Sequence, residues 1–173
     1  MDLFEAIRRR RSVRSFTSEP IPEPDLLTIL EQACLAPSAG NVQPWRLVIV
    51  TDSTIKGKIA RAALGQSFIA TAPVVIVVCA DLSSSAAVYG GRGVSLYSIQ
   101  DTAAATQNIL LAATALEYGS CWVGAFDERQ VSQILGIPSE FRPVAVIPIG
   151  RPSRIPPQVG KKPLKAVLHL ERY

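Results

Sequence analysis

The residues best suited to chemistry lie in one short stretch between a predicted helix and a predicted strand. This stretch reads Ala36-Pro-Ser-Ala-Gly-Asn-Val-Gln-Pro-Trp-Arg46. Its two prolines stiffen the backbone, and Gly40 lets another object approach the chain closely. Ser38, Asn41 and Gln43 can direct hydrogen-bond donors and acceptors at a flat, polar ligand. The stretch therefore indicates a binding surface, although a capped helix end followed by a tight turn explains the same residues about equally well.

A second set of candidate residues is a basic cluster near the start of the chain. Arginine occupies positions 8, 9, 10, 11 and 14, and this cluster accounts for much of the net charge of +4. Arginine forks hold phosphate oxygens bidentately, and Ser12 adds a hydroxyl donor. The cluster thus predicts a local anionic partner. Two other interpretations stay open: a solvated basic turn at a helix end, and a nucleic-acid patch, although the cluster lacks interleaved aromatic residues except Phe16.

Several common catalytic systems are excluded by the residue content. His169 is the only histidine, so a histidine-based metal cluster cannot form, and no G-x-S-x-G elbow accompanies that histidine. The chain also lacks a P-loop and a G-x-G-x-x-G motif after a strand. Gly90-Gly-Arg-Gly93 lies in a segment, residues 81–98, that reads as a mobile loop. With few reactive side chains available, an enzyme of this sequence would depend on a cofactor.

Length and composition predict one globular domain, residues 1–173, with a substantial core. Of the 173 residues, 48% are hydrophobic and 18% are charged. No signal-peptide pattern is visible, and the apolar run Ala72–Ala80 is too short to span a bilayer. Cys34, Cys79 and Cys121 lie in apolar patterns, so we expect buried free thiols in a reducing compartment. The expected location is therefore the cytoplasm.

Hydrophobic periodicity and turn residues predict alternating helices and strands. Helices are expected over residues 2–11, 22–35, 54–64, 98–118 and 127–136. Strands are expected over residues 46–50, 74–80, 121–123, 144–149 and 167–170. Ser98 and Asp101 resemble a capping box at the start of the longest helix. The Val/Ile-rich run 74–80 is typical of a strand buried on both faces, so we expect an α+β or α/β protein with a central sheet.

Two features favour a homodimer. The longest helix carries small residues at 103–105 and 112–113, so a second large element must cover it, and a second subunit is the natural candidate. Residues 151–163 are rich in proline and predict an extended arm that could cross a neighbour and pair residues 167–170 with the neighbour's sheet. The alternatives are a central helix in a monomer and a loosely held tail.

Five segments, in this order, resemble the FMN-dependent nitroreductase family. They are Arg10-Arg-Ser-Val-Arg-Ser-Phe16, Ala36-Pro-Ser-Ala-Gly-Asn-Val-Gln-Pro-Trp45, Gln100-Asp-Thr-Ala-Ala, Gly119-Ser-Cys-Trp-Val-Gly-Ala-Phe126 and Ile149-Gly150. The resemblance covers essentially the whole chain. It implies an α+β fold with a mixed sheet flanked by helices and an intertwined homodimer. Residues 151–173 would form an arm on the partner subunit, and two FMN sites would lie at the interface.

The resemblance also implies which residues bind FMN. The phosphate, the ribityl chain and the N1/O2 edge of the ring would be bound by Arg10, Arg11, Ser12 and Arg14. The partner subunit would contribute Pro37, Ser38, Ala39 and Asn41, with Gln43 beside them. The backbone near flavin N5 would come from Val123 and Gly124. A late basic ligand of the phosphate matches Lys161 or Lys162.

The implied activity is a ping-pong reaction. NADH or NADPH would deliver hydride to N5 of FMN, and a nitroaromatic, quinone or similar small acceptor would then take electrons from the same face. No catalytic side chain and no metal would be required, and no nucleic acid or membrane partner is expected. Alternatives are other flavin chemistry of the family (flavin fragmentation, reductive dehalogenation or azoline oxidation), a non-enzymatic flavin carrier, and a basic nucleic-acid-binding protein. The chain has no clear counterpart of the insertions that shape the pockets of the best-known nitroaromatic reductases, so the substrate stays open. The alternative flavin chemistries share the dimer but differ in loops, and residues 81–98 are where such a difference is expected.

Overall fold

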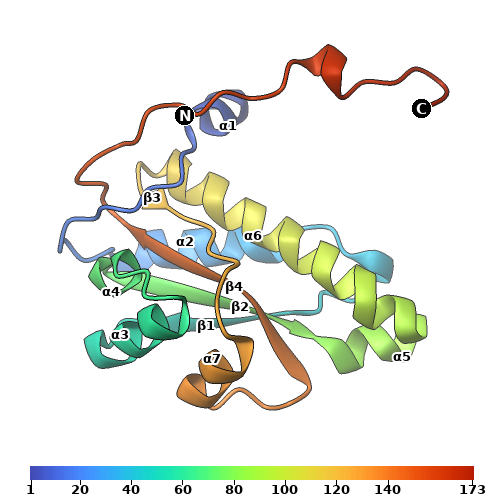
Figure 1. Cartoon of the computed structure of the whole chain (residues 1–173), viewed down its shortest axis with the longest axis horizontal. Helices are drawn as coiled ribbons and strands as arrows, with labels where there is room; N and C mark the ends of the chain where they lie inside the picture. Colours follow the sequence, from blue (N-terminus) through green and yellow to red (C-terminus); the bar gives the residue numbers. More distant parts are fainter.

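The computed structural model describes residues 1–173 and is built around a four-stranded sheet (Figure 1). The strands are β1 (Trp45–Val50), β2 (Val74–Asp81), β3 (Gly119–Ser120) and β4 (Phe141–Gly150), in the order β1-β2-β4-β3. All three ladders are antiparallel, and the only parallel pairing is an isolated bridge between Ser12 and Ser120. The sheet is therefore less mixed than the resemblance implied.

Helices cover both faces of the sheet and bury β2 completely. One face packs against α2 (Glu23–Cys34) and α6 (Ser98–Ala115). The other packs against α3 (Ser53–Ala62), α4 (Phe68–Thr71) and α7 (Glu128–Leu135). Because side chains alternate along a strand, Ile76 and Val78 enter the first layer of core and Val75 and Val77 the second. The predicted strand with two buried faces is thus confirmed.

Short-range capping explains where several helices begin and end. Asp2 opens α1 (Leu3–Arg9), Asp52 opens α3 and Asp127 opens α7; each carboxylate accepts a backbone N–H three residues later, at 2.8 to 2.9 Å. Gly136 ends α7 with a left-handed φ of 65°. These helices lie within a few residues of the predicted bounds.

The predicted mobile loop over residues 81–98 is wrong, because residues 82–98 are helical and Asp81 ends β2. Asp81 caps α5 (Leu82–Arg92) by accepting the Ser84 N–H at 3.0 Å, and a π-helical turn, Gly93–Tyr97, leads into α6. Gly93 is buried against the Ser85 carbonyl, with no room for a Cβ. Glycine therefore serves close helix packing at this position, which a sequence pattern cannot distinguish from loop composition.

The predicted capping box at Ser98 is also wrong. Ser98 continues a helical backbone from the π-helical turn, and its hydroxyl donates to the Val94 carbonyl at 3.0 Å. Asp101 instead accepts the backbone N–H of Ala39 at 3.1 Å, so its carboxylate binds a distant loop.

Residues 151–173 leave the body of the molecule as an extended arm (Figure 1). The start of the arm is fixed, because Thr17 N donates to Arg151 O at 2.9 Å and Ser153 N donates to Ser15 O at 3.0 Å. Every residue from Pro157 to Tyr173 is exposed. The strand predicted over 167–170 does not form within this chain, where a 3₁₀ turn, Leu164–Ala166, precedes irregular backbone.

Smaller corrections concern a strand and a thiol. The predicted strand 121–123 is reduced to a single bridge between Val123 and Val146, following β3. Cys79 and Cys121 are buried as expected, whereas Cys34 is exposed near the end of α2. None of the helices is both long enough and apolar enough to cross a membrane.

Candidate functional site

The basic cluster lies on an extended segment that is fixed from both sides. After α1 ends at Arg9, the chain runs between β3 and the start of the arm. Val13 N donates to Ser120 O at 2.9 Å on one side, and Phe16 bridges to Pro152 on the other. Ser12 and Arg14 therefore project from a backbone that two neighbouring segments hold in place.

A cavity of about 350 Å³ brings most of the predicted phosphate ligands together. Its polar lining includes Arg8, Arg10, Arg11, Ser12, Arg14 and Lys161. None of these arginines is paired with a carboxylate. The Arg14 guanidinium lies near the Cys121 thiol, and its Cζ is 5.8 Å from the centroid of the Phe68 ring. Several unpaired guanidinium groups around one cavity suit an anion with several acceptor oxygens, such as a phosphate. Lys162, the other predicted basic ligand, does not line this cavity.

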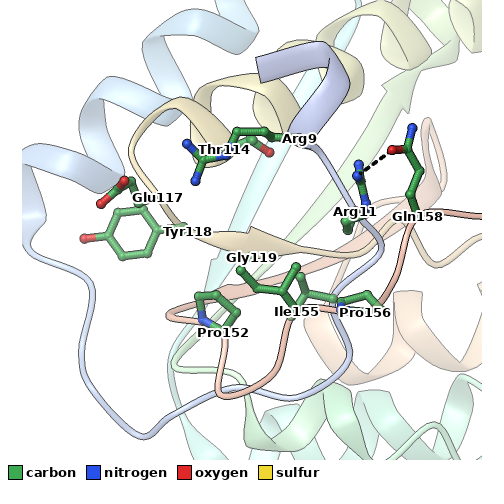
Figure 2. Close-up of a pocket in the computed structure, with 11 residues that line it drawn as sticks. Arg9, Arg11, Thr114, Glu117, Tyr118, Gly119, Pro152, Ile155, Pro156 and Gln158 are labelled. Atoms are coloured by element: carbon green, nitrogen blue, oxygen red, sulfur yellow. Dashed lines mark hydrogen bonds between the residues drawn. The ribbon is translucent and has the colours of Figure 1, made fainter. Parts of the chain in front are cut away.

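Arg11 differs from its neighbours because its guanidinium is already used within the chain. Its Nη1 donates to the carbonyls of Arg8 and Arg10 at 2.6 and 2.8 Å, and its Nη2 donates to Gln158 Oε1 at 3.1 Å (Figure 2). It thereby closes the C-terminal end of α1 and fastens the arm. A second cavity, of about 500 Å³, lies beside this contact and is drawn in Figure 2.

Gly124 presents a free backbone donor on the segment that follows β3. Val123 N donates to Val146 O at 3.0 Å, and the Val123 side chain is buried. Gly124 is exposed, its N–H has no partner within the chain, and no atom lies within 4 Å of where a Cβ would stand. Of the two residues predicted for this position, Gly124 is therefore the one whose N–H can reach a ligand.

Cys121 lies between β3 and Gly124, next to the basic cluster. Burial raises the pKa of the Cys121 thiol, while the positive charges of Arg14 and Arg10 and contact with Ser12 act in the opposite direction. The thiol stays neutral at physiological pH, so this residue packs as a small apolar group.

The amide loop, residues 36–46, adopts an unusual backbone. Gly40, Asn41 and Gln43 all have left-handed φ values, of 54°, 56° and 53°. Left-handed backbone at a non-glycine residue costs on the order of 1–3 kcal/mol, so the surroundings must hold it. Ser38 Oγ accepts the Gln43 N–H at 2.9 Å, which closes the loop on itself.

Two residues outside the loop hold it in this conformation. Asp101 Oδ1 accepts the Ala39 N–H at 3.1 Å, and the Tyr89 hydroxyl packs so closely on Gly40 that a Cβ there would displace it. Asp101 is only 7% exposed, its Oδ2 has no partner, and burial raises its pKa. Sequence reasoning missed both roles, because Tyr89 lay in a presumed loop and Asp101 in a presumed cap.

The two sets of site residues lie at opposite ends of α6. Asp101, in the first turn of α6, binds the amide loop. At the other end, β3 follows the last turn of α6, and the basic cluster lies beside β3 (Figure 1). An 18-residue helix is about 27 Å long. The amide loop and the basic cluster of one chain therefore cannot both contact the same small ligand.

The comparisons with known proteins agree on one family. The Nitroreductase family matches residues 7–151, so the chain belongs to it and is an NAD(P)H oxidoreductase. It is 33% identical to an NADH dehydrogenase of Thermus thermophilus, with 97% of this chain and 95% of the relative covered.

Solved structures show the same fold. A nitroreductase family protein from Clostridium novyi NT is 32% identical, with a TM-score of 0.82 over 88% of this chain and 86% of its own. The NADPH:FMN oxidoreductase from Vibrio harveyi, complexed with NAD⁺, is 28% identical, with a TM-score of 0.91 over 99% of this chain and 77% of its own. The fold is thus nitroreductase-like, α+β with a four-stranded sheet flanked by helices.

Proposed function

We propose that this enzyme is an FMN-dependent homodimer in which each flavin lies between the basic cluster of one subunit and the amide loop of the other. The observation that carries the proposal is the placement of two ligand-ready polar sets at opposite ends of α6. Each set has donors or charges without partners, and neither can reach the other within one chain. A two-fold axis beside α6 would place the basic cluster of each subunit next to the amide loop of the other, so a dimer would have two such sites.

The exposed side of α6 supports such an interface. Leu111, Ala112 and Ala115 line an apolar groove of about 370 Å³ together with Leu3 and Ala6 of α1. Small residues let a second helix approach closely, and burial of such a surface stabilises association. The proposal therefore places a second copy on this groove.

The arm supports the same arrangement. It carries apolar side chains at Leu164, Val167, Leu168 and Leu170, which remain 51 to 80% exposed in their own chain. Exposed apolar residues gathered on an extended segment are typical of a surface that a partner covers. In the proposed dimer, residues 151–173 pack on the other subunit.

The residues around the basic cavity fit the anionic half of FMN. Arg10, Arg14, Ser12 and Lys161 would hold the phosphate and the polar edge of the ring, and the Gly124 N–H would meet the ring near N5. The cavity volume of about 350 Å³ lies within the range of small-molecule sites. Arg11 would contribute mainly by closing α1, and Lys162 would stay in solvent. The partner's loop, with Pro37, Ser38, Ala39, Asn41 and Gln43, would cover the ring.

Bound FMN would supply the two-electron chemistry between NAD(P)H and an acceptor. The protein's part is then to bind, orient and tune. A fixed cation such as Arg14 at the N1/O2 edge favours the form of the ring with more negative charge. A charged hydrogen bond contributes about 1.5–3 kcal/mol, which corresponds to roughly 30–65 mV for a two-electron couple. Replacing Arg14 should therefore lower the potential of the bound flavin.

Nitroaromatic compounds and quinones are the proposed acceptors, and the cytoplasm is the proposed location. Flavin fragmentation, dehalogenation and azoline oxidation use the same dimer, and a panel of substrates under anaerobic conditions separates them. Purified protein should be yellow and should bleach when NADH or NADPH is added without oxygen. Protein that stays colourless and takes up no added FMN would contradict the proposal.

A complementation experiment tests whether two chains build each site. One variant carries Arg10→Ala and Arg14→Ala, and the other carries Asp101→Ala and Gly40→Val; each alone should bind FMN poorly. When the two variants are refolded together, random pairing restores about a quarter of the wild-type sites, because each mixed dimer contains one intact site. A site formed within one chain would recover nothing. Size-exclusion chromatography with light scattering confirms that dimers form.

A further inference from the structure

An aromatic and basic cluster lies beside the amide loop, and apart from the contact of Tyr89 with Gly40 it has no role in the proposed flavin site. It consists of Tyr89 and Arg92 on α5 and Tyr97 on the π-helical turn. The two tyrosine rings meet edge to face, with centroids 5.0 Å apart and an interplanar angle of 84°. Arg92 Cζ lies 5.2 Å from the centroid of the Tyr97 ring, and Arg92 Nε donates to the Tyr97 hydroxyl at 2.9 Å.

These contacts hold the Arg92 guanidinium in place without neutralising it. Arg92 is exposed and pairs with no carboxylate, and its two terminal nitrogens donate no hydrogen bond within the chain. A guanidinium fixed through Nε presents its other donors as a fork, the geometry that suits a carboxylate or a phosphate.

The backbone supports this placement at some cost. Gly90 has φ 55° and ψ −140°, a conformation that is essentially restricted to glycine, and it kinks the last turn of α5 before Arg92. The π-helical turn follows at once, and such turns recur at functional sites. An ordinary surface arginine would need neither feature.

The cluster adjoins the amide loop directly, because the Tyr89 hydroxyl packs on Gly40. We propose that Arg92, Tyr97 and Tyr89 form a subsite for the anionic group of the ligand that stacks on the flavin. The shared chemistry is a carboxylate or phosphate held by the Arg92 fork and flanked by tyrosine rings. The inference rests on the proposed function, which places the amide loop over the partner's flavin.

Two ligands could supply this anion, and matched pairs of probes distinguish them. An aromatic acceptor could carry a carboxylate, for which benzoate and benzamide are the charged and neutral probes. A nicotinamide nucleotide could carry the 2′-phosphate, for which NADP⁺ and NAD⁺ are the probes. Each probe is titrated into the FMN-loaded dimer, and its dissociation constant is read from the flavin absorbance.

The wild type should bind the more anionic member of at least one pair more tightly, and Arg92→Gln should weaken that member by about tenfold or more, the effect of losing one charged hydrogen bond. The less anionic member of the pair should change less than about twofold, within the spread of surface substitutions. Loss confined to benzoate identifies an acceptor subsite, and loss confined to NADP⁺ identifies a nucleotide subsite. Tyr97→Phe keeps the charge but removes its anchor and should give an intermediate loss.

Arg129→Gln, an exposed arginine on α7, is the matched control and should leave all four constants unchanged. The inference is overturned if the wild type shows no preference in either pair, or if the preference survives in Arg92→Gln. FMN content is measured in every variant. Loss of FMN from the wild type itself would point to failure of the proposed function, whereas a loaded wild type with no role for Arg92 would overturn only this subsite.

Discussion

The two ends of α6 carry site residues of opposite character. The end next to β3 has charge without an ionic partner: Arg10 and Arg14 pair with no carboxylate, and the segment that carries them is extended. The other end depends on contacts within the chain: the amide loop has three left-handed residues held by Asp101, Tyr89 and its own Ser38.

This difference shows how the chain divides its work. Charged side chains attract an anion even when they move, so the basic end needs only a fixed backbone. Short polar side chains must be placed accurately to meet a flat ring, so the amide end stores strain and uses buried contacts to hold it. In the proposed dimer, each site combines long-range attraction from one subunit with accurate positioning from the other.

Removing charge from the basic end should have the largest effect. The double variant Arg10→Ala/Arg14→Ala loses two charged hydrogen bonds, each of about 1.5–3 kcal/mol, so FMN should bind about 10²- to 10⁴-fold more weakly. Fluorescence titration of the apoprotein with FMN measures this, with Arg129→Ala as the control. Arg11→Ala should lower the melting temperature and reduce FMN affinity less than the double variant does, because Arg11 caps the end of α1 and binds Gln158. Equal losses of affinity in Arg11→Ala and the double variant would contradict this division.

Loosening the amide end should have a smaller effect on FMN. Asp101→Ala removes the acceptor of the Ala39 N–H, a bond to a charged group worth about 1.5–3 kcal/mol, and part of this appears as weaker FMN binding, about tenfold. Asp101→Asn keeps an acceptor and should bind FMN nearly normally. If Asp101→Asn and Asp101→Ala lose the same FMN affinity, then Asp101 does more than hold the amide loop.

The same pair of variants gives a pH test. Because burial raises the folded-state pKa of Asp101, its favourable contribution is complete below the ordinary value of about 4 and is lost as pH rises through the raised pKa. Asparagine stays neutral, so the melting temperature of Asp101→Asn relative to wild type should increase as pH rises through that range. A difference that does not change with pH would show that the carboxylate is not penalised by burial.

A substitution on the far face of the sheet should separate stability from binding. Lys56 Nζ donates to the carbonyls of Ala72 at 2.6 Å and Pro73 at 3.2 Å, just before β2. Lys56→Met leaves these carbonyls without that donor, which should cost about 1–3 kcal/mol of unfolding free energy and lower the melting temperature by several degrees. FMN affinity should not change. A parallel loss of FMN would show that both faces support the site.

The smallest effect is expected at the contact between Tyr118, in the turn that follows α6, and α2. The Tyr118 hydroxyl donates to Asp25 Oδ2 at 2.6 Å, and Tyr118→Phe should cost about 1 kcal/mol at neutral pH. Burial, followed by the bond to Asp25, raises the pKa of Tyr118 to about 12. The contribution is therefore complete below about pH 10, the ordinary tyrosine value, and is lost as pH rises toward 12. Urea unfolding at pH 7 and pH 11 measures it, and an equal difference at both would contradict this assignment.

Local rules predicted the parts of the fold that local residues determine. The Val/Ile-rich run predicted β2, and Asp127 and Gly136 predicted the two ends of α7. Both predictions succeeded because burial pattern and capping act within a few residues. The helical nature of 82–98 was missed, since it depends on Gly93 packing against Ser85. The role of Arg11 was missed for the same reason: its partner Gln158 lies 147 positions away.

The candidate site was predictable in type but not in arrangement. Arginine chemistry indicated a phosphate, and the resemblance located the basic cluster, the amide loop and the segment at Gly124. Which of Lys161 and Lys162 faces the cavity depends on how the arm crosses α1, and which of Val123 and Gly124 has a free N–H depends on the bridge to Val146. These choices are tertiary, so no pattern within either segment could decide them.

The exposed arm has a consequence for how the protein behaves on dilution. In a lone chain, the apolar side chains of Leu164, Val167, Leu168 and Leu170 stay exposed to water and contribute little to the folded state. If two chains exchange arms, part of each subunit's stability comes from association and follows mass action, so the melting temperature should fall as the protein is diluted. Cofactor retention would then depend on concentration as well, because separated subunits would release a group that only the assembled pair encloses.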